Sequence, residues 1–264
     1  MNQGTVSVGP VLGVVLAALV LVAVAAAVIG RLGVSRAVVT ASLRAVAQLG
    51  LVSLLIAAVL RSWWATAGFI VLMVLVAALT SARRVSTLRL GWMVILPIAA
   101  GALPAGALIV ATGAMPLTEV AVLPIAGILI GGAMTATSLA GRRALDELRD
   151  RHGEYEAALA LGFLPRDAAL EVVRPTAGQA LVPALDQTRT VGLVTLPGAF
   201  VGVMLGGGSA IQAGATQLLV LLALLAVEAI AAAVTVELVA AGLITRAAAQ
   251  PEPRSRRRRT AQPK

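Results

Sequence analysis

Polar side chains inside long apolar stretches are the residues of this sequence best placed to handle a polar solute. Arg44 and Gln48 interrupt one such stretch and lie one helical turn apart. Asp186 and Arg189 interrupt another, at a spacing that permits an ion pair on one helix face. Glu228 lies deep in a third. Because charged groups are costly in hydrocarbon and are retained where they bind or pair, we predict that these residues line a path for an ion or polar solute.

Each of these residues also has a structural alternative. Arg44 could extend its side chain to the headgroups at the cytoplasmic interface, and the Asp186–Arg189 pair could serve only to hold its helix. Glu237 lies nine residues after Glu228, so the two face opposite sides of a helix that turns by about 100° per residue. They cannot line one path together. Glu228, the deeper of the two, is the better candidate for a cation contact.

The sequence lacks the residue types that covalent catalysis by a thiol and nucleotide hydrolysis by a P-loop require. Cysteine is absent and the single histidine, His152, lies in a polar segment, so neither a thiol nucleophile nor a histidine cluster for metal can form. The only lysine is Lys264 at the C-terminus, which excludes a Walker A loop. We predict no catalytic residue and no cofactor bound by this chain, and the sequence identifies no metal ligand. Any ATP must be hydrolysed by a partner.

The stretches that hold these residues are long enough to cross a bilayer. The chain has 264 residues, of which 59% are hydrophobic and 12% are charged, against about 25% charged in a soluble domain. A hydrocarbon core about 30 Å thick needs a helix of about 20 apolar residues. We predict an all-α, polytopic transmembrane bundle in the plasma (inner) membrane, with about seven spans at residues 10–30, 37–60, 63–82, 91–112, 119–140, 180–205 and 215–245.

The arginines decide the expected orientation, because cytoplasmic loops carry an excess of basic residues. With the N-terminus outside, the inner loops and the tail hold almost all of them, whereas the outer loops hold Arg61. We predict that the N-terminus is outside and the C-terminus is cytoplasmic. The transmembrane domain is then 1–246, with a nearly neutral cytoplasmic region at 141–180. The remainder, 247–264, is a disordered basic tail that contacts membrane lipid rather than nucleic acid.

The cytoplasmic region contains the segment Glu156–Pro175, EAALALGFLPRDAALEVVRP. Its spacing resembles the EAA signature of ABC-transporter permeases, with Arg174 in place of the usual leucine. The positions in register are Glu156, Ala157, Ala158, Gly162, Val172 and Pro175. The resemblance implies that the first four of these belong to a coupling helix that docks into a separate ATP-binding subunit. The alternative is an ordinary helix–turn–helix corner that packs on its own bundle.

Further segments match one family of such permeases in the same order. They are LRAVAQL (43–49), PIAGILIGGAM (124–134), LVPALDQTRTVGLVTLPG (181–198) and a closing span with Gln217. The chain resembles the FetB-like iron-export ABC permeases, which are related to the plant aluminium-sensitivity permeases. The resemblance covers nearly the whole chain between Arg36 and Ile244. It implies export of a metal ion, iron in bacteria, by a homodimer of permeases that works with a separately encoded ATPase.

The matching segments add three candidates for the solute path. Met134 closes one segment, and Pro197 and Gly198 close another, where they could break a membrane helix and expose backbone carbonyls. The chain departs from the family pattern at Gly132 and at 199–200, where relatives carry asparagine and two methionines.

Three alternatives to iron export stay open. The first is an ABC exporter of another small solute. The second is a stand-alone secondary transporter, coupled to an ion through Asp186 or Glu228. The third is a membrane-embedded enzyme or scaffold, and the lack of a catalytic cluster argues against the enzyme.

Overall fold

The computed structural model of the protein describes residues 9–85 and 92–245, whose regular structure is helical apart from one isolated β-bridge. The predicted all-α class is confirmed. The basic tail expected at 247–264 lies outside the described residues. Six helices are long and apolar enough to cross a membrane. They are α1 (Pro10–Ile29), α2 (Ser35–Val59), α3 (Trp63–Val85), α5 (Glu119–Asp150), α10 (Ala210–Ala240) and the span Trp92–Ala111, in which a 3-10 turn leads into α4 (Ile95–Ala111).

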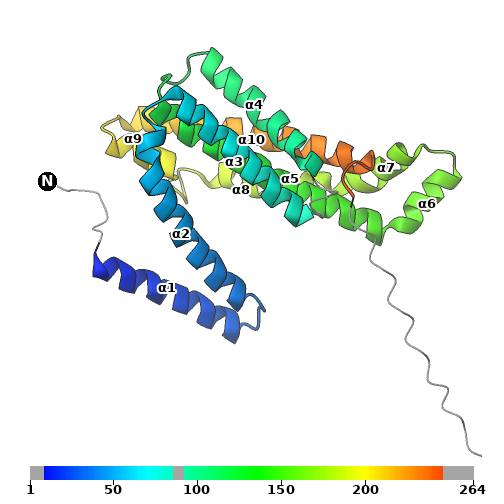
Figure 1. Ribbon diagram of the computed structural model, residues 1–264. Helices are drawn as coiled ribbons and strands as arrows, with labels where there is room; N and C mark the ends of the chain where they lie inside the picture. Colours follow the sequence, from blue (N-terminus) through cyan, green and yellow to red (C-terminus); the bar gives the residue numbers. More distant parts are fainter. Residues whose placement is uncertain (1–8, 86–91, 246–264) are drawn as a thin grey trace, which may run out of the picture.

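The expected span at 180–205 is broken rather than continuous, which corrects the sequence interpretation. It forms a short 3-10 turn, then α8 (Val182–Thr190), an irregular stretch and α9 (Gly198–Leu205). The irregular stretch ends at Pro197. Proline has no backbone N–H to donate, and its ring clashes with the preceding turn of a helix, so a helix does not continue through it. Figure 1 shows that this segment still carries the chain back along the bundle, from the end where α5 stops to the end where α10 begins. Among the described residues, six helices are thus continuous candidate spans, and the expected seventh span is not one continuous helix.

The centre of the bundle is formed by α5 and α10, with α3 and α4 packed against them. Many of the residues buried at these contacts are small: Ala133, Ala136 and Ala140 come from α5, and Ala231 comes from α10. Small side chains let helix backbones approach closely, which matters in lipid because the hydrophobic effect does not drive helices together there. The helices are thus held by close packing.

One of these close approaches joins α4 to α10 at Gly101. A Cβ atom at this position would lie 2.6 Å from the carbonyl oxygen of Val227. We expect Gly101→Ala to destabilise the bundle by about 1–3 kcal/mol, because the backbone of α10 would have to move. Gly106→Ala on the same helix is the control, since no atom lies within 4 Å of its Cβ position. Thermal unfolding in detergent measures both, and equal melting temperatures would contradict this packing.

The hairpin of α1 and α2 leaves the bundle at an angle (Figure 1). α1 packs against α2, and α2 contacts α3. Ala27 is the one buried residue of α1, and α2 buries none. Most of the surface of this hairpin is therefore open to lipid or to another protein.

A helical elbow projects from the bundle beyond the C-terminal ends of α5 and α10 (Figure 1). It consists of α6 (His152–Ala160) and α7 (Pro165–Ala177). α7 buries Ala169, Leu170 and Val173, whereas α6 buries no residue. The elbow is thus attached to the bundle through α7 and exposes α6.

Candidate functional site

Glu228, the predicted cation contact, lies at a cavity of about 240 Å³ between α5, α8 and α10. Gly131 and Thr135 of α5 and Gln187 of α8 line the same cavity. Glu228 is only 7% exposed and makes no hydrogen bond or ion pair with any other residue that the structure describes. A carboxyl group that is buried, unpaired and adjacent to a cavity is a candidate ligand for a bound ion or polar solute.

Gly132 makes room for this carboxyl group. A Cβ atom at this position would lie 2.3 Å from Cδ1 of Leu224 and 3.0 Å from Oε1 of Glu228. Any larger residue would therefore have to displace the side chain that forms the site. Gly132, where this chain differs from the family pattern, therefore lies directly beside Glu228, the candidate ligand.

A second cavity, of about 220 Å³, lies further along α10, where Gln217, Gly192 and Pro197 line it. Gln217 is 5% exposed, and its Oε1 has no hydrogen-bond partner within the described part of the chain. Gln217 precedes Glu228 by eleven residues, about three helical turns, so the two side chains share one face of α10. Gln217 was not predicted as a site residue, although the spacing of two polar residues, Gln217 and Glu228, on one face of an apolar helix indicates it.

The uncharged and acidic polar side chains at the two cavities carry oxygen atoms: Glu228, Gln187 and Thr135 line the first cavity, and Gln217 lines the second, which is otherwise apolar. Oxygen ligands suit hard and borderline cations. Within residues 9–85 and 92–245, no three His, Cys, Asp or Glu side chains gather as a metal site. Within one chain, the Glu228 cavity therefore offers a single carboxylate beside a few neutral polar side chains.

Asp186 and Arg189 pair with each other on α8, as their spacing predicted, with 3.4 Å between the Oδ1 and Nη1 atoms. Their side chains are 61% and 72% exposed, beside the cavity residue Gln187. We expect Asp186→Ala to lower transport severalfold while membrane insertion persists, because an exposed pair adds at most about 1 kcal/mol to stability. Flux assays on vesicles with equal protein content test this, and normal flux would remove Asp186 from the path.

Met134 lies away from the cavity. Its side chain packs against the bundle core, and its carbonyl oxygen accepts a hydrogen bond from Ser81 on α3, at 3.4 Å. Met134 therefore faces α3 and not the cavity beside Glu228.

Arg44 and Gln48 are also separated from Glu228 within one chain. Both are exposed on α2, and neither pairs with another residue in the described ranges. α2 diverges from α8 and α10 (Figure 1). The structure thus places Gln187 beside Glu228, with Gln217 at a separate cavity on the same face of α10, and leaves the polar residues of α2 outside both.

Pro197 and Gly198 lie at the break between α8 and α9, where the sequence placed a helix interruption. Gly198 is the first residue of α9, and Pro197 also lines the cavity with Gln217. Inside the break, the amide of Gly192 donates to the carbonyl oxygen of Thr195 at 2.8 Å. Irregular backbone at membrane depth is tolerated only against protein or a water-filled cavity, which agrees with a path along this segment.

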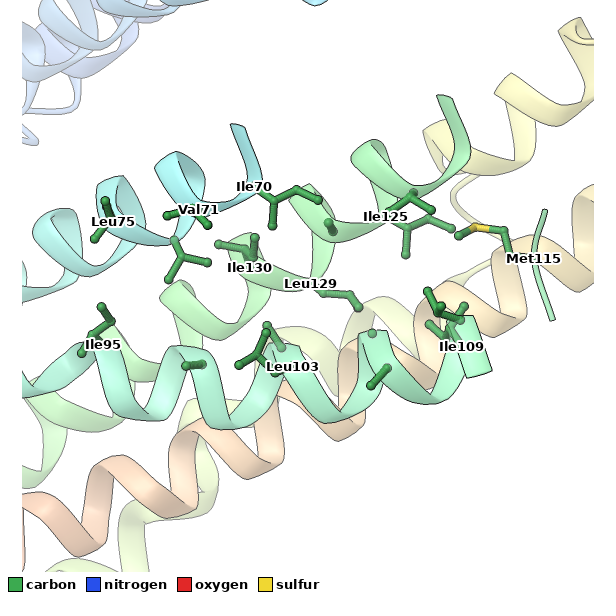
Figure 2. Close-up of a pocket in the computed structure, with 18 residues that line it drawn as sticks. Ile70, Val71, Leu75, Ile95, Leu103, Ile109, Met115, Ile125, Leu129 and Ile130 are labelled. Carbon is green, nitrogen blue, oxygen red and sulfur yellow. The ribbon is translucent and has the colours of Figure 1, made fainter. Parts of the chain in front are cut away.

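A larger cavity, of about 530 Å³, lies between α3, α4 and α5 (Figure 2). Apolar side chains alone line it, among them Ile70, Leu103 and Ile125 (Figure 2). It offers no polar side chain to an ion, so the smaller cavity at Glu228 is the better candidate for solute.

The predicted coupling residues lie on the exposed elbow. Glu156, Ala157 and Ala158 belong to α6, and Gly162 turns the chain toward α7 with a φ of 92°. Apolar side chains are exposed at this corner: Leu161 is 80%, Phe163 45% and Leu164 68% exposed. Apolar groups exposed on a segment outside the membrane spans indicate a protein partner.

Ion pairs tie the elbow to the two central helices. Arg151, at the end of α5, donates to the carbonyl oxygen of Val172 at 3.0 Å and also pairs with Glu154. The hydrogen bonds from Arg151 hold the pKa of Glu154 below its usual value, so this pair stays charged at neutral pH. Glu237 of α10 pairs with Arg166 and Arg174 of α7. Movement of the elbow would therefore reach α5 and α10 together.

The sequence pattern of the Uncharacterised protein family (UPF0014) matches residues 12–244 of this chain. The chain belongs to the UPF0014 family. UPF0014 membrane protein STAR2 of Oryza sativa subsp. japonica is 34% identical over 219 residues, 81% of this chain and 76% of that protein. The predicted multi-pass membrane protein is thereby confirmed.

Two further UPF0014 relatives match over about half of their lengths. Protein ALUMINUM SENSITIVE 3 of Arabidopsis thaliana is 38% identical over 150 residues, 56% of this chain and 55% of that protein. Probable iron export permease protein FetB of Escherichia coli (strain K12) is 32% identical over 123 residues, 45% of this chain and 46% of that protein. The resemblance stated from the sequence is confirmed. No solved structure matches this UPF0014 chain.

Proposed function

We propose that this protein is the membrane-spanning permease subunit of an ABC exporter. In this proposal it moves a metal ion, iron, out of the cytoplasm across the plasma membrane, with energy from ATP hydrolysed by a separate subunit. The observation that carries the proposal is the exposed elbow of α6 and α7. Its sequence matches the EAA signature, and its corner presents apolar side chains outside the membrane spans.

The attachment of the elbow supports a mechanical role. An ATP-binding subunit that grips α6 would pull on α7, which buries one face against α5 and α10 and is fastened to Glu237 by two arginines. Those two helices carry the walls of the Glu228 cavity. A small displacement of the elbow would thus move the helices that line the cavity. Closely packed helices transmit such a movement because a protein interior has low compressibility.

The charge of the cavity supports a cationic solute. Glu228 is the one acidic side chain lining the cavity, and no basic side chain of the described residues neutralises it. Carboxylates in helical bundles bind iron in other proteins, such as the ferritin-like folds. The name of the FetB relative adds iron export as the first assignment to test.

The expected orientation places the elbow where an ATP-binding subunit can reach it, and the direction, export, is proposed from the name of the FetB relative. With the C-terminus inside, the elbow faces the compartment that holds ATP, and the arginines near it obey the positive-inside rule. Two permease copies with two ATP-binding subunits complete the proposed transporter.

Inverted membrane vesicles test the proposal directly, with the chain and its ATP-binding subunit co-expressed. We expect Fe²⁺ to accumulate inside the vesicles when ATP is added, and not with a non-hydrolysable analogue. Al³⁺ and Mn²⁺ in parallel assays determine the solute. ATP-dependent accumulation of none of these ions would overturn metal export, whereas uptake of Al³⁺ or Mn²⁺ without Fe²⁺ would overturn iron.

A further inference from the structure

One face of α2 carries small and polar residues and is open. The half-buried residues of α2 lie on one side of the helix: Ser35, Val38, Ser42, Val52, Ile56 and Val59. Arg44 points about 120° away from that side, on a helix that turns by about 100° per residue. The residues that share its face in the N-terminal half of α2 are Ala37, Thr40, Ala41, Ala47 and Gln48, and Leu51 and Leu55 continue that face toward the C-terminal end. Small residues with a few polar groups are typical of helix–helix contacts in membranes.

Arg44 needs a partner that its own chain does not supply. It lies nine residues into the 25-residue helix α2, about 13 Å from the start of that helix. It makes no hydrogen bond or ion pair with the described residues. A charged group within a span faces protein or a water-filled cavity rather than lipid. The open face of α2 is therefore expected to contact protein.

The cavity at Glu228 has complementary properties. Its carboxyl group has no basic partner within the described residues. The rim of the cavity is also small and polar: Gly131 has no atom within 4 Å of its Cβ position, and Thr135 and Gln187 are exposed. A helix with small residues could approach this rim closely.

The broken span beside this cavity also needs a cover. The break exposes Leu193 and Val194, which are 91% and 77% exposed, and α8 exposes the Asp186–Arg189 pair. Irregular backbone and charged side chains do not face lipid. A protein surface over the face formed by α8 and the break would satisfy both requirements.

From these complementary surfaces we infer that α2 of a second copy of this chain lies against the Glu228 cavity, where Arg44 of one copy pairs with Glu228 of the other. Under twofold symmetry the contact occurs twice, so each solute site is built from both chains. An entering cation would compete with the arginine for the carboxylate. The inference rests on the two-copy arrangement of the proposed function but not on its ATPase or its solute.

Crosslinking between two differently tagged copies tests this arrangement. One copy carries Arg44→Cys and the other carries Glu228→Cys, and no native cysteine interferes. A short thiol-to-thiol reagent is applied to intact membranes, because an Arg–Glu pair holds its Cβ atoms further apart than a disulfide allows. Thr135→Cys, at the rim of the cavity, is a second acceptor if Glu228→Cys does not insert. Val46→Cys, about 200° around α2 from Arg44, is the matched control.

We expect a band that contains both tags when Arg44→Cys is combined with either acceptor, and no such band with Val46→Cys. Equal yields from Arg44→Cys and Val46→Cys would overturn the inference. So would the absence of a two-tag band from both acceptors when the chains are inserted. The ATP-binding subunit is omitted from the crosslinking, and its binding to the same chains is measured in a separate co-purification. A two-tag band from chains that fail to co-purify with that subunit would sink the proposed function and leave this inference standing.

Discussion

Replacing Glu228 by glutamine is expected to lower ATP-dependent transport by about 10- to 100-fold. Glutamine keeps the shape of the side chain but removes the one acidic group that lines the cavity between α5, α8 and α10. A contact with a charged group is worth about 1.5–3 kcal/mol, and each 1.4 kcal/mol corresponds to a factor of ten. The measurement is the initial rate of Fe²⁺ uptake into inverted vesicles, divided by the amount of inserted protein.

Two further variants show whether the effect comes from the charge at Glu228 or from the loss of any carboxylate in the protein. Glu119→Gln removes a carboxyl group at the first residue of α5 and is expected to leave transport near the original rate. Glu228→Asp keeps the charge and should retain more transport than Glu228→Gln. A normal rate for Glu228→Gln would exclude this carboxylate from the path, whatever the other variants show.

Replacing Leu161, Phe163 and Leu164 together by serine is expected to weaken binding of the ATP-binding subunit by at least about 100-fold. Burying one large apolar side chain is worth about 1.5–3 kcal/mol, so losing three at one contact exceeds the roughly 2.7 kcal/mol that this factor requires. The three residues are exposed in the free chain, so its melting temperature should hardly change. Co-purification and titration of the ATP-binding subunit measure the effect.

The matched control is Leu117→Ser, which removes a residue 59% exposed just before α5, at the end of the bundle away from the elbow. Gly162→Val tests the shape of the elbow separately. The φ of 92° at Gly162 strains a β-branched residue, whereas Gly153→Ala changes a position in α6 with no atom near its Cβ. Unchanged co-purification of both the serine variant and Gly162→Val would show that α6 does not couple to an ATPase.

The long helices could be predicted from sequence because their apolar runs exceed the bilayer thickness. The break was predicted only at Pro197 and Gly198; its extent over 191–197 was not, because the exposed Leu193, Val194 and Leu196 are as apolar as α9, which follows them. Hydropathy reports how apolar a segment is, and not whether its backbone stays helical. Pro197 indicates that the helix is interrupted, but the turn at Gly192 depends on how this segment packs against the rest of the protein.

The candidate site was predicted in part. Glu228 was identifiable because it is a lone acidic residue deep in an apolar run. Helical spacing placed Gln48 beside Arg44 on one face, but could not show that α2 leaves the bundle. Met134 was expected in the path and instead packs toward α3, because a segment resemblance does not determine which face of α5 meets the cavity. The role of Gly132 depends on the contact between α5 and α10, which single-helix patterns do not contain.

Transport by purified protein in liposomes tests the division of labour between this chain and its partner most directly. The chain is reconstituted alone and together with the ATP-binding subunit, and Fe²⁺ movement against its gradient is followed with and without ATP. We predict uphill movement only when both polypeptides and ATP are present. Uphill movement by this chain alone, driven by an ion gradient, would contradict the account and identify a secondary transporter.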